Sequence, residues 1–269
     1  MTAAAAFGTT AATRFSTQVR QRFAVGASAY DQEAHLQRAV AWRLAHHCRH
    51  LPLLPGPRAD LGAGTGLLSR ALLEQWPSGN ASPRLQQIDL CPELLTRNAL
   101  ANSRERRGWD LERGLPAAAQ SAALLISSFA LQWLENPAKQ LEGWCHSLMP
   151  GGWLALAVPT SGSFPQWRSA AAAAAVPCTA LPLPDAEALI AAAERGGLGL
   201  RHAQVLRFQR LCLDGHEALG RMRALGAGAS RSAPLSAAQL RRLLRHWKQP
   251  GLSWEVLLLL GSRPTTGGS

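Results

Sequence analysis

The sequence predicts an α/β fold: a Rossmann-like, seven-stranded, mostly parallel sheet with helices on both faces. Three observations lead to this prediction. Short apolar segments alternate with helical patterns over residues 59–158, at the pitch of βαβ units. An acid, Asp60, is followed by glycines at alternate positions over residues 62–66 and then by a helical pattern. A second short segment also ends in an acid, Asp89, and Pro92 follows it in the first turn of the next helix.

The expected strands are short apolar segments bounded by turn residues. The first is weakly hydrophobic for a buried parallel strand, and the third is barely visible. The last two follow the helices that come after Pro159. In chain order, the expected strands are 59–61, 85–90, a short strand before Asp110, 122–128, 153–158, 200–213 and 254–260.

The expected helices begin and end at recognisable signals. Gly26 divides the first helical region in two, and Pro77-Ser78-Gly79-Asn80 and Met149-Pro150-Gly151-Gly152 stop later helices. In chain order, the expected helices are two within 15–50, then 67–76, 92–103, 137–148, 163–175, 184–195, 216–225 and 236–248.

These elements predict one domain over residues 15–265 after a disordered tail, 1–14. Within it we expect an N-terminal helical cap (15–50), a cofactor-binding core (51–160), and lid helices with the C-terminal strands (161–250). A chain of 269 residues with 47% hydrophobic residues can bury one good core. It contains no apolar run of the ~18 residues that a membrane span needs.

The composition favours a cytoplasmic protein without a metal. Its five cysteines lie far apart and form no Cys-x-x-Cys pair, and the first residues do not resemble a secretory signal. The net charge is +11, and the excess of arginine is concentrated before residue 51 and after residue 198. The flanks therefore indicate a basic surface for an acidic partner, unless arginine simply serves solubility here.

The glycine-rich segment predicts the cofactor class. Its Gly-x-Gly-x-Gly spacing differs from the Gly-x-Gly-x-x-Gly of nicotinamide dinucleotide sites. Glycines let the backbone approach a ligand closely, and the following helix N-terminus offers free N–H groups for a carboxylate. The segment is therefore typical of a nucleoside cofactor without a pyrophosphate, for which S-adenosylmethionine (SAM) is the candidate.

Polar side chains at later strand ends extend this site. An acid at the position of Asp89 accepts ribose hydroxyls in doubly wound folds. Asp110 could accept the adenine amino group, and Ser127 with Ser128 ends the fourth strand, where parallel sheets bind ligands. The predicted cofactor-binding set is Gly62, Ala63, Gly64, Gly66, Asp89, Leu90, Asp110, Leu111, Ser127 and Ser128.

Four further segments resemble the malonyl-[acyl-carrier protein] O-methyltransferases of biotin synthesis, within the class I SAM-dependent methyltransferases. The first contains Tyr30, the chain's only tyrosine, at the position where that family has one. The match departs from the family in four places, since Ser128 replaces the usual Asn and strand 122–128 has no leading acid. The first strand is also shorter and more polar than usual, and the stretch 104–112 before and after Asp110 is irregular. The matching segments are Arg22–Gln37, Ser128–Trp133, Gly162–Pro165 and Arg221–Ala229.

The resemblance implies methyl transfer from SAM to the free carboxylate of a malonyl thioester, leaving S-adenosylhomocysteine. The thioester is carried on an acidic acyl-carrier protein, or on coenzyme A, and no nucleic acid or membrane takes part. Tyr30 is the predicted catalytic residue of a monomer. The predicted carrier-docking residues are Arg221, Arg223, Arg241, Arg242 and Arg245. The predicted substrate-binding residues are Phe129, Gln132, Trp133, Ser163 and Phe164.

Three alternatives stay open from the sequence. A sister methyltransferase acting on a free acid such as trans-aconitate would share the fold and the chemistry. A nucleic-acid-modifying protein would explain the charge, but Ser128-Phe129-Ala130-Leu131 stands where a base-flipping motif would. A chain that binds SAM without transferring its methyl group is the third.

Overall fold

The computed structural model describes residues 11–77 and 83–265 and confirms the predicted α/β architecture. Its seven strands follow the order β3-β2-β1-β4-β5-β7-β6. Neighbouring strands among β1 to β5 pair in parallel, whereas β7 runs antiparallel to both β5 and β6. The strands are β1 (Arg58–Leu61), β2 (Gln86–Asp89), β3 (Arg106–Gly108), β4 (Ala122–Ser128), β5 (Leu148–Pro159), β6 (Gly199–Arg210) and β7 (Leu252–Ser262).

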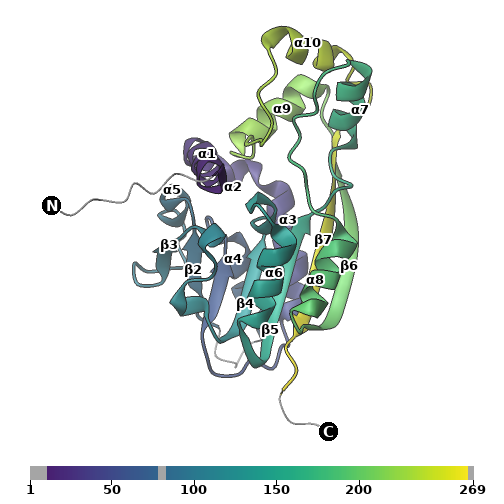
Figure 1. Cartoon of the computed structure of the whole chain (residues 1–269). Coiled ribbons are helices and arrows are strands. Elements are labelled where there is room, and N and C mark those ends of the chain that lie inside the picture. Colours follow the sequence, from purple (N-terminus) through teal and green to yellow (C-terminus); the bar gives the residue numbers. More distant parts are fainter. Residues whose placement is uncertain (1–10, 78–82, 266–269) are drawn as a thin grey trace, which may run out of the picture.

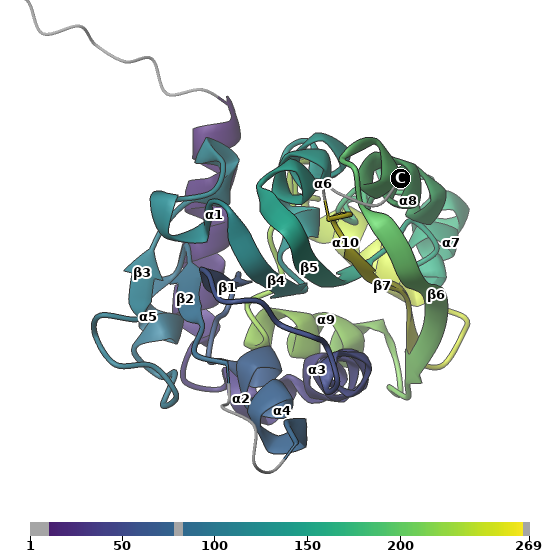
Figure 2. The same ribbon diagram turned by 90° about the horizontal axis from the view of Figure 1, so that it is seen from below.

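Helices cover both faces of this sheet, with α6 and α8 on one face and α3 and α4 on the other (Figures 1 and 2). Several begin at side-chain caps, as at Asn136 before α6 and at the Ser236–Gln239 capping box of α10. The helices are α1 (Ala11–Gly26), α2 (Tyr30–Glu33), α3 (His35–Cys48), α4 (Leu67–Gln75), α5 (Pro92–Leu95), α6 (Pro137–His146), α7 (Pro165–Ala173), α8 (Ala186–Arg195), α9 (Gly215–Ala224) and α10 (Ala237–Arg245).

The central strand β4 anchors the core. Its residues from Ala122 to Ser127 are almost completely buried, and both faces contribute to apolar clusters. Burial on both faces explains why the strand reads as a continuous apolar run in the sequence. The carboxyl ends of β1, β2 and β4 meet at one edge of the sheet, which is where open α/β sheets place their ligands.

Two sequence predictions need correction. The helix expected over 92–103 ends at Leu95, because Asn98 turns inward, is fully buried and donates to Gln87 Oε1 at 2.7 Å. Helix α1 begins at Ala11, inside the expected tail, while residues 1–10 lie outside the described residues. The turn expected at Pro77–Asn80 also lies mostly outside them.

A group of helices stands beyond the ligand-binding edge of the sheet. Helices α7, α9 and α10 gather there, with α1 and α2 beside them (Figure 1). Helices α1 and α9 meet closely at their ends. A Cβ atom on Gly26 would lie 2.8 Å from Ala224 O, and one on Gly226 would lie 2.8 Å from Phe23 Cα. Glycine is therefore required at both positions, and the contact joins the N-terminal helices to the C-terminal ones.

Candidate active site

The glycine turn after β1 is shaped by three left-handed residues. Gly62, Gly64 and Gly66 have φ values of +74°, +53° and +85°. A Cβ atom on Gly62 would lie 2.1 Å from Ala130 Cβ, and one on Gly66 would lie 2.6 Å from Asn98 Oδ1. Gly64 has more space, since its nearest neighbours would be Leu94 at 3.8 Å and Asp89 Oδ2 at 4.0 Å. Gly62 and Gly66 are thus needed for close packing, whereas Gly64 borders the cavity described below.

Asp89, at the end of β2, is held beside this turn. Its carboxylate accepts hydrogen bonds from Gly64 N at 2.8 Å and from Cys91 N at 2.7 Å. Burial raises the pKa of Asp89 to about 6, against the lowering effect of these N–H donors. The side chain is therefore fixed in place but still has oxygen lone pairs free to accept hydroxyl donors.

A narrow cavity of about 80 Å³ adjoins these groups, and we call it the cofactor cavity. The Ser128 hydroxyl borders it, is buried and has no hydrogen-bond partner in the described part of the chain. Residues of α1, including Ser16 and Val19, form the opposite wall. Seven residues of the predicted cofactor-binding set line this cavity: Gly62, Gly64, Asp89, Leu90, Asp110, Leu111 and Ser128.

The polar groups of this cavity are those that a bound SAM nucleoside would need, whereas its volume of about 80 Å³ is smaller than the roughly 300–1,000 Å³ of most ligand pockets. A nucleoside needs acceptors for its ribose hydroxyls and adenine amino group, which Asp89 and Asp110 can supply. Asp110 also caps a short 3-10 helix by accepting from Glu112 N at 3.0 Å, so its orientation is defined. The unpartnered Ser128 hydroxyl can donate or accept one further hydrogen bond.

Four residues predicted for the site line neither this cavity nor the larger one described below: Ala63, Gly66, Ser127 and Ser163. Ala63 and Gly66 belong to the turn itself. Ser127 donates to the backbone oxygen of Leu61 at 2.7 Å, and Ser163 exchanges hydrogen bonds with the backbone of Glu255. The structure therefore gives both hydroxyls a role in joining strands and loops, which differs from the predicted ligand contacts.

A second, larger cavity of about 660 Å³ adjoins the first, and we call it the acceptor cavity. It lies among α1, α2, α9, α10 and the loops around residues 180 and 230. Four tryptophans contribute to a mainly apolar wall, and Gln132 and Phe164, which are predicted to bind substrate, also line it. The two cavities share Phe23, Tyr30, Phe129 and Trp133. These four aromatic residues thus form the boundary at which two bound molecules would meet.

Tyr30 is held at this boundary by its neighbour in the sequence. Asp31 accepts a hydrogen bond from the Thr65 hydroxyl at 2.5 Å, which ties α2 to the glycine turn. Phe23 packs edge-on against both Tyr30 and Trp133, with ring centroids 6.2 and 5.6 Å apart. Burial, with the nearby charges of Asp89 and Asp31, raises the pKa of Tyr30. Its hydroxyl is therefore neutral at physiological pH and available as a hydrogen-bond donor.

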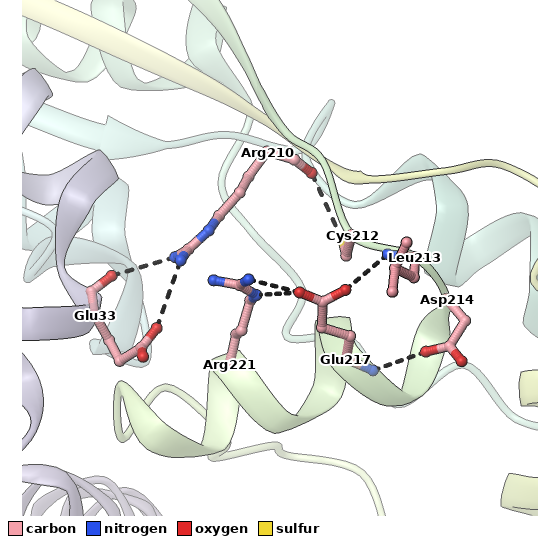
Figure 3. A network of polar contacts seen from close by, with 7 residues as sticks. All are labelled: Glu33, Arg210, Cys212, Leu213, Asp214, Glu217 and Arg221. Carbon is pink, nitrogen blue, oxygen red and sulfur yellow. Dashed lines mark hydrogen bonds and ion pairs between the residues drawn. The ribbon is translucent and has the colours of Figure 1, made fainter.

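Polar contacts join α2 to the sheet and α9 to the residues before it (Figure 3). Arg210 of β6 pairs with Glu33 of α2 at 3.6 Å. Arg221 contacts Glu217 within α9, and Glu217 also accepts from Leu213 N at 2.7 Å. The first contact ties α2 to β6, and the others stabilise the start of α9.

Sequence reasoning missed several of these residues. Asp31, Thr65 and Phe23 lie in segments that the sequence singles out, but their contacts with each other's elements and with Trp133 join positions distant in the chain and have no local signal. Arg22 and Arg223 line the acceptor cavity as well. Arg223 was predicted only as a carrier contact, and Arg22 only as part of a matching segment. No cluster of metal-ligating side chains occurs within residues 11–77 and 83–265, and no helix there is long and apolar enough to cross a membrane.

Comparison with known proteins supports this description. A family model described as a methyltransferase domain matches residues 59–156. A malonyl-[acyl-carrier protein] O-methyltransferase from Magnetococcus marinus is 31% identical over 80% of each chain. The biotin biosynthesis bifunctional protein BioCD of Bordetella avium is 32% identical over 87% of this chain and 49% of its own.

Two further similarities complete the comparison. A trans-aconitate 2-methyltransferase from Streptomyces avermitilis is 33% identical, but over only 44% of each chain. Among solved structures, the putative methyltransferase bound to the Trm112 activator of Haloferax volcanii has a TM-score of 0.58. It covers 93% of this chain and 100% of its own at 18% identity, so it supports the fold alone.

Proposed function

Because this chain belongs to the class I SAM-dependent methyltransferases, in the family of the malonyl-[acyl-carrier protein] O-methyltransferases, we propose that it methylates the free carboxylate of a malonyl thioester. The thioester is carried on an acyl-carrier protein, and the reaction is an early step of biotin synthesis. The observation that carries this proposal is the junction of the two cavities at Tyr30 and Phe129. A methyl donor on one side and a long, partly apolar acceptor on the other would meet there.

The residues at the junction act by positioning. SAM, when bound, supplies an electrophilic methyl group. An acceptor carboxylate with a pKa of ~4 is already ionised at pH 7, so no general base is required. The protein's contribution is to align the carboxylate and to exclude water, for which the aromatic boundary is suited.

Tyr30 is the proposed catalytic residue. Its raised pKa keeps the hydroxyl protonated, so it donates a hydrogen bond to the acceptor carboxylate and does not accept a proton. The Asp31–Thr65 hydrogen bond fixes the helix that presents it. We expect Tyr30→Phe to lower turnover roughly 10-fold or more, the cost of about one charged hydrogen bond, with SAM affinity within about threefold of wild type. Unchanged turnover in steady-state kinetics would remove Tyr30 from the mechanism.

A basic face would attract the acidic carrier. On α10, Arg241, Arg242 and Arg245 are exposed, whereas Leu243 and Leu244 on the same helix are buried beside α7. Arg221, by contrast, is neutralised by Glu217. We therefore assign the docking role to α10 and not to Arg221, since unpaired surface arginines raise the encounter rate with an anionic partner.

The second candidate is methylation of a free acid such as trans-aconitate. The shorter similarity to a trans-aconitate 2-methyltransferase favours it. The volume and the four tryptophans of the acceptor cavity disfavour it, because a small, highly charged acid would leave that apolar wall unused. Turnover on malonyl-carrier protein, malonyl-coenzyme A and free acids separates the two candidates.

A further inference from the structure

The charged side chains of the acceptor cavity are both arginines. Among the described residues of its wall, Arg22 on α1 and Arg223 on α9 carry charge, and the others are apolar, aromatic or neutral polar. The described lining residues of the cavity include no Asp or Glu. The cavity is therefore suited to a molecule that combines an apolar body with an anionic group.

Neither arginine is neutralised by a carboxylate within residues 11–77 and 83–265. Their neighbours on the same helices are paired, since Arg20 contacts Glu93 at 3.3 Å and Arg221 contacts Glu217 at 2.5 Å (Figure 3). On each helix, one arginine forms an ion pair (Arg20 or Arg221). The arginine two residues later, Arg22 or Arg223, lines the acceptor cavity without a carboxylate partner.

The contact between α1 and α9 brings the backbones beside these two residues together. The backbone oxygen of Arg22 would lie 2.9 Å from a Cβ atom on Gly226, three residues after Arg223. Both arginines are exposed, and both line the acceptor cavity but not the cofactor cavity. Neither therefore belongs to the four aromatic residues that the two cavities share, where the reacting carboxylate must lie.

We propose that Arg22 and Arg223 bind the phosphate group of the pantetheine arm that carries the malonyl thioester. This inference rests on the proposed function. A guanidinium group matches the geometry of a phosphate through parallel N–H donors. With the phosphate held by the arginines, the uncharged arm lies along the apolar wall and the acyl end reaches the junction. The two arginines thus select thioesters on a phosphorylated arm over free acids.

Direct binding measurements test this assignment without requiring turnover. 4′-Phosphopantetheine and pantetheine, which lacks the phosphate, are titrated into wild-type protein and into Arg22→Gln, Arg223→Gln and the double variant. We expect wild type to prefer 4′-phosphopantetheine, and each substitution to weaken its binding about tenfold, the value of one charged hydrogen bond. Pantetheine affinity should stay within about twofold. An unchanged ratio of the two affinities in the double variant would overturn the assignment.

Kinetics with malonyl-4′-phosphopantetheine and malonyl-pantetheine provide the second readout. We expect the substitutions to raise KM for malonyl-4′-phosphopantetheine with little change in kcat, and to leave both parameters for malonyl-pantetheine unchanged. Equal losses on both substrates would mean that the arginines contact the acyl carboxylate, and would contradict the inference. If wild type methylates neither thioester, the proposed function fails, while the binding ratio still decides the role of the arginines.

Matched controls separate this effect from net charge. Arg14 on α1 and Arg43 on α3 are exposed and line neither cavity. The double variant Arg14→Gln/Arg43→Gln removes the same two charges, so its affinity ratio should equal that of wild type. A comparable loss in this control would show that long-range attraction, and not a local site, favours the phosphate.

Discussion

Substitution of the glycine turn separates its packing role from its ligand-binding role. At Gly62, an alanine Cβ would lie 2.1 Å from Ala130 Cβ, so the backbone must move. Overpacking costs about 1–3 kcal/mol and the left-handed conformation about 1–2 kcal/mol more. At Gly64 the space is sufficient, and only the conformational cost of about 1–2 kcal/mol applies.

The two variants should therefore differ in stability and in SAM binding. For a chain of this size, about 1 kcal/mol corresponds to a Tm shift of roughly 2–4 °C. We expect Gly62→Ala to lose roughly 4–20 °C and Gly64→Ala roughly 2–8 °C. Gly64→Ala should nevertheless lose SAM affinity at least about tenfold, because its methyl group enters the cofactor cavity beside Asp89.

Thermal denaturation and isothermal titration with SAM measure these two effects. Gly143→Ala in α6 is the control, because its Cβ would have no neighbour within 4 Å and its φ is ordinary. We expect it to bind SAM normally and to be as stable as wild type or more stable by about 0.5–1 kcal/mol. Normal SAM affinity in Gly64→Ala would refute the placement of the cofactor beside this residue.

Asp60, Arg231 and the α10 arginines each allow a further prediction. Burial raises the pKa of Asp60 to about 7, so between pH 4 and 7 the folded state binds more protons than the unfolded state. The stability that the protonated Asp60 contributes is therefore lost as the pH rises through this range. Melting curves at pH 5 to 8 should show a smaller decrease for Asp60→Asn than for wild type, and parallel curves would contradict the assignment. Arg231 lies over the Phe15 ring at 3.9 Å and donates to Trp133 O, so Arg231→Gln should loosen α1 by about 1 kcal/mol. We expect faster proteolytic cleavage within α1, while the rest of the chain stays resistant. An unchanged cleavage rate would show that the Arg231 contacts do not hold α1 in place. Replacing Arg241, Arg242 and Arg245 by Gln should raise KM for the malonyl-carrier but not for malonyl-pantetheine, and should flatten the salt dependence of the former. A carrier KM insensitive to salt in wild type would exclude electrostatic docking.

The fold was largely predictable from local signals, and the exceptions have physical causes. The alternation of strand and helix patterns predicts the parallel sheet. Strands such as β4 are easy to recognise because burial on both faces makes them continuous apolar runs. The helix beginning at Pro92 was predicted too long because propensity is local. The helix ends early because the buried Asn98 side chain forms a hydrogen bond with Gln87 of strand β2, a contact between segments that local propensity does not reveal.

The candidate site was predictable where a motif marks it and not where distant segments meet. Gly64, Asp89 and Ser128, predicted from the glycine spacing and from the ends of strands, line one cavity, and their contacts with a cofactor stay a prediction. Ser127 and Ser128 were both predicted as ligands, although adjacent strand residues point to opposite faces, and only Ser128 reaches the cavity. That Arg22 and Arg223 line the same cavity could not be foreseen, because they lie on α1 and α9, which meet only in the folded chain.

The central claim is that the methyl group goes to the carboxylate of a malonyl thioester. Purified protein is incubated with methyl-labelled SAM and, in separate reactions, with malonyl-carrier protein, malonyl-coenzyme A, free malonate and trans-aconitate, and the products are identified by mass spectrometry. The account predicts a methyl ester on the malonyl thioesters, with little or no label on either free acid. Label transferred to trans-aconitate in preference to both thioesters would contradict it.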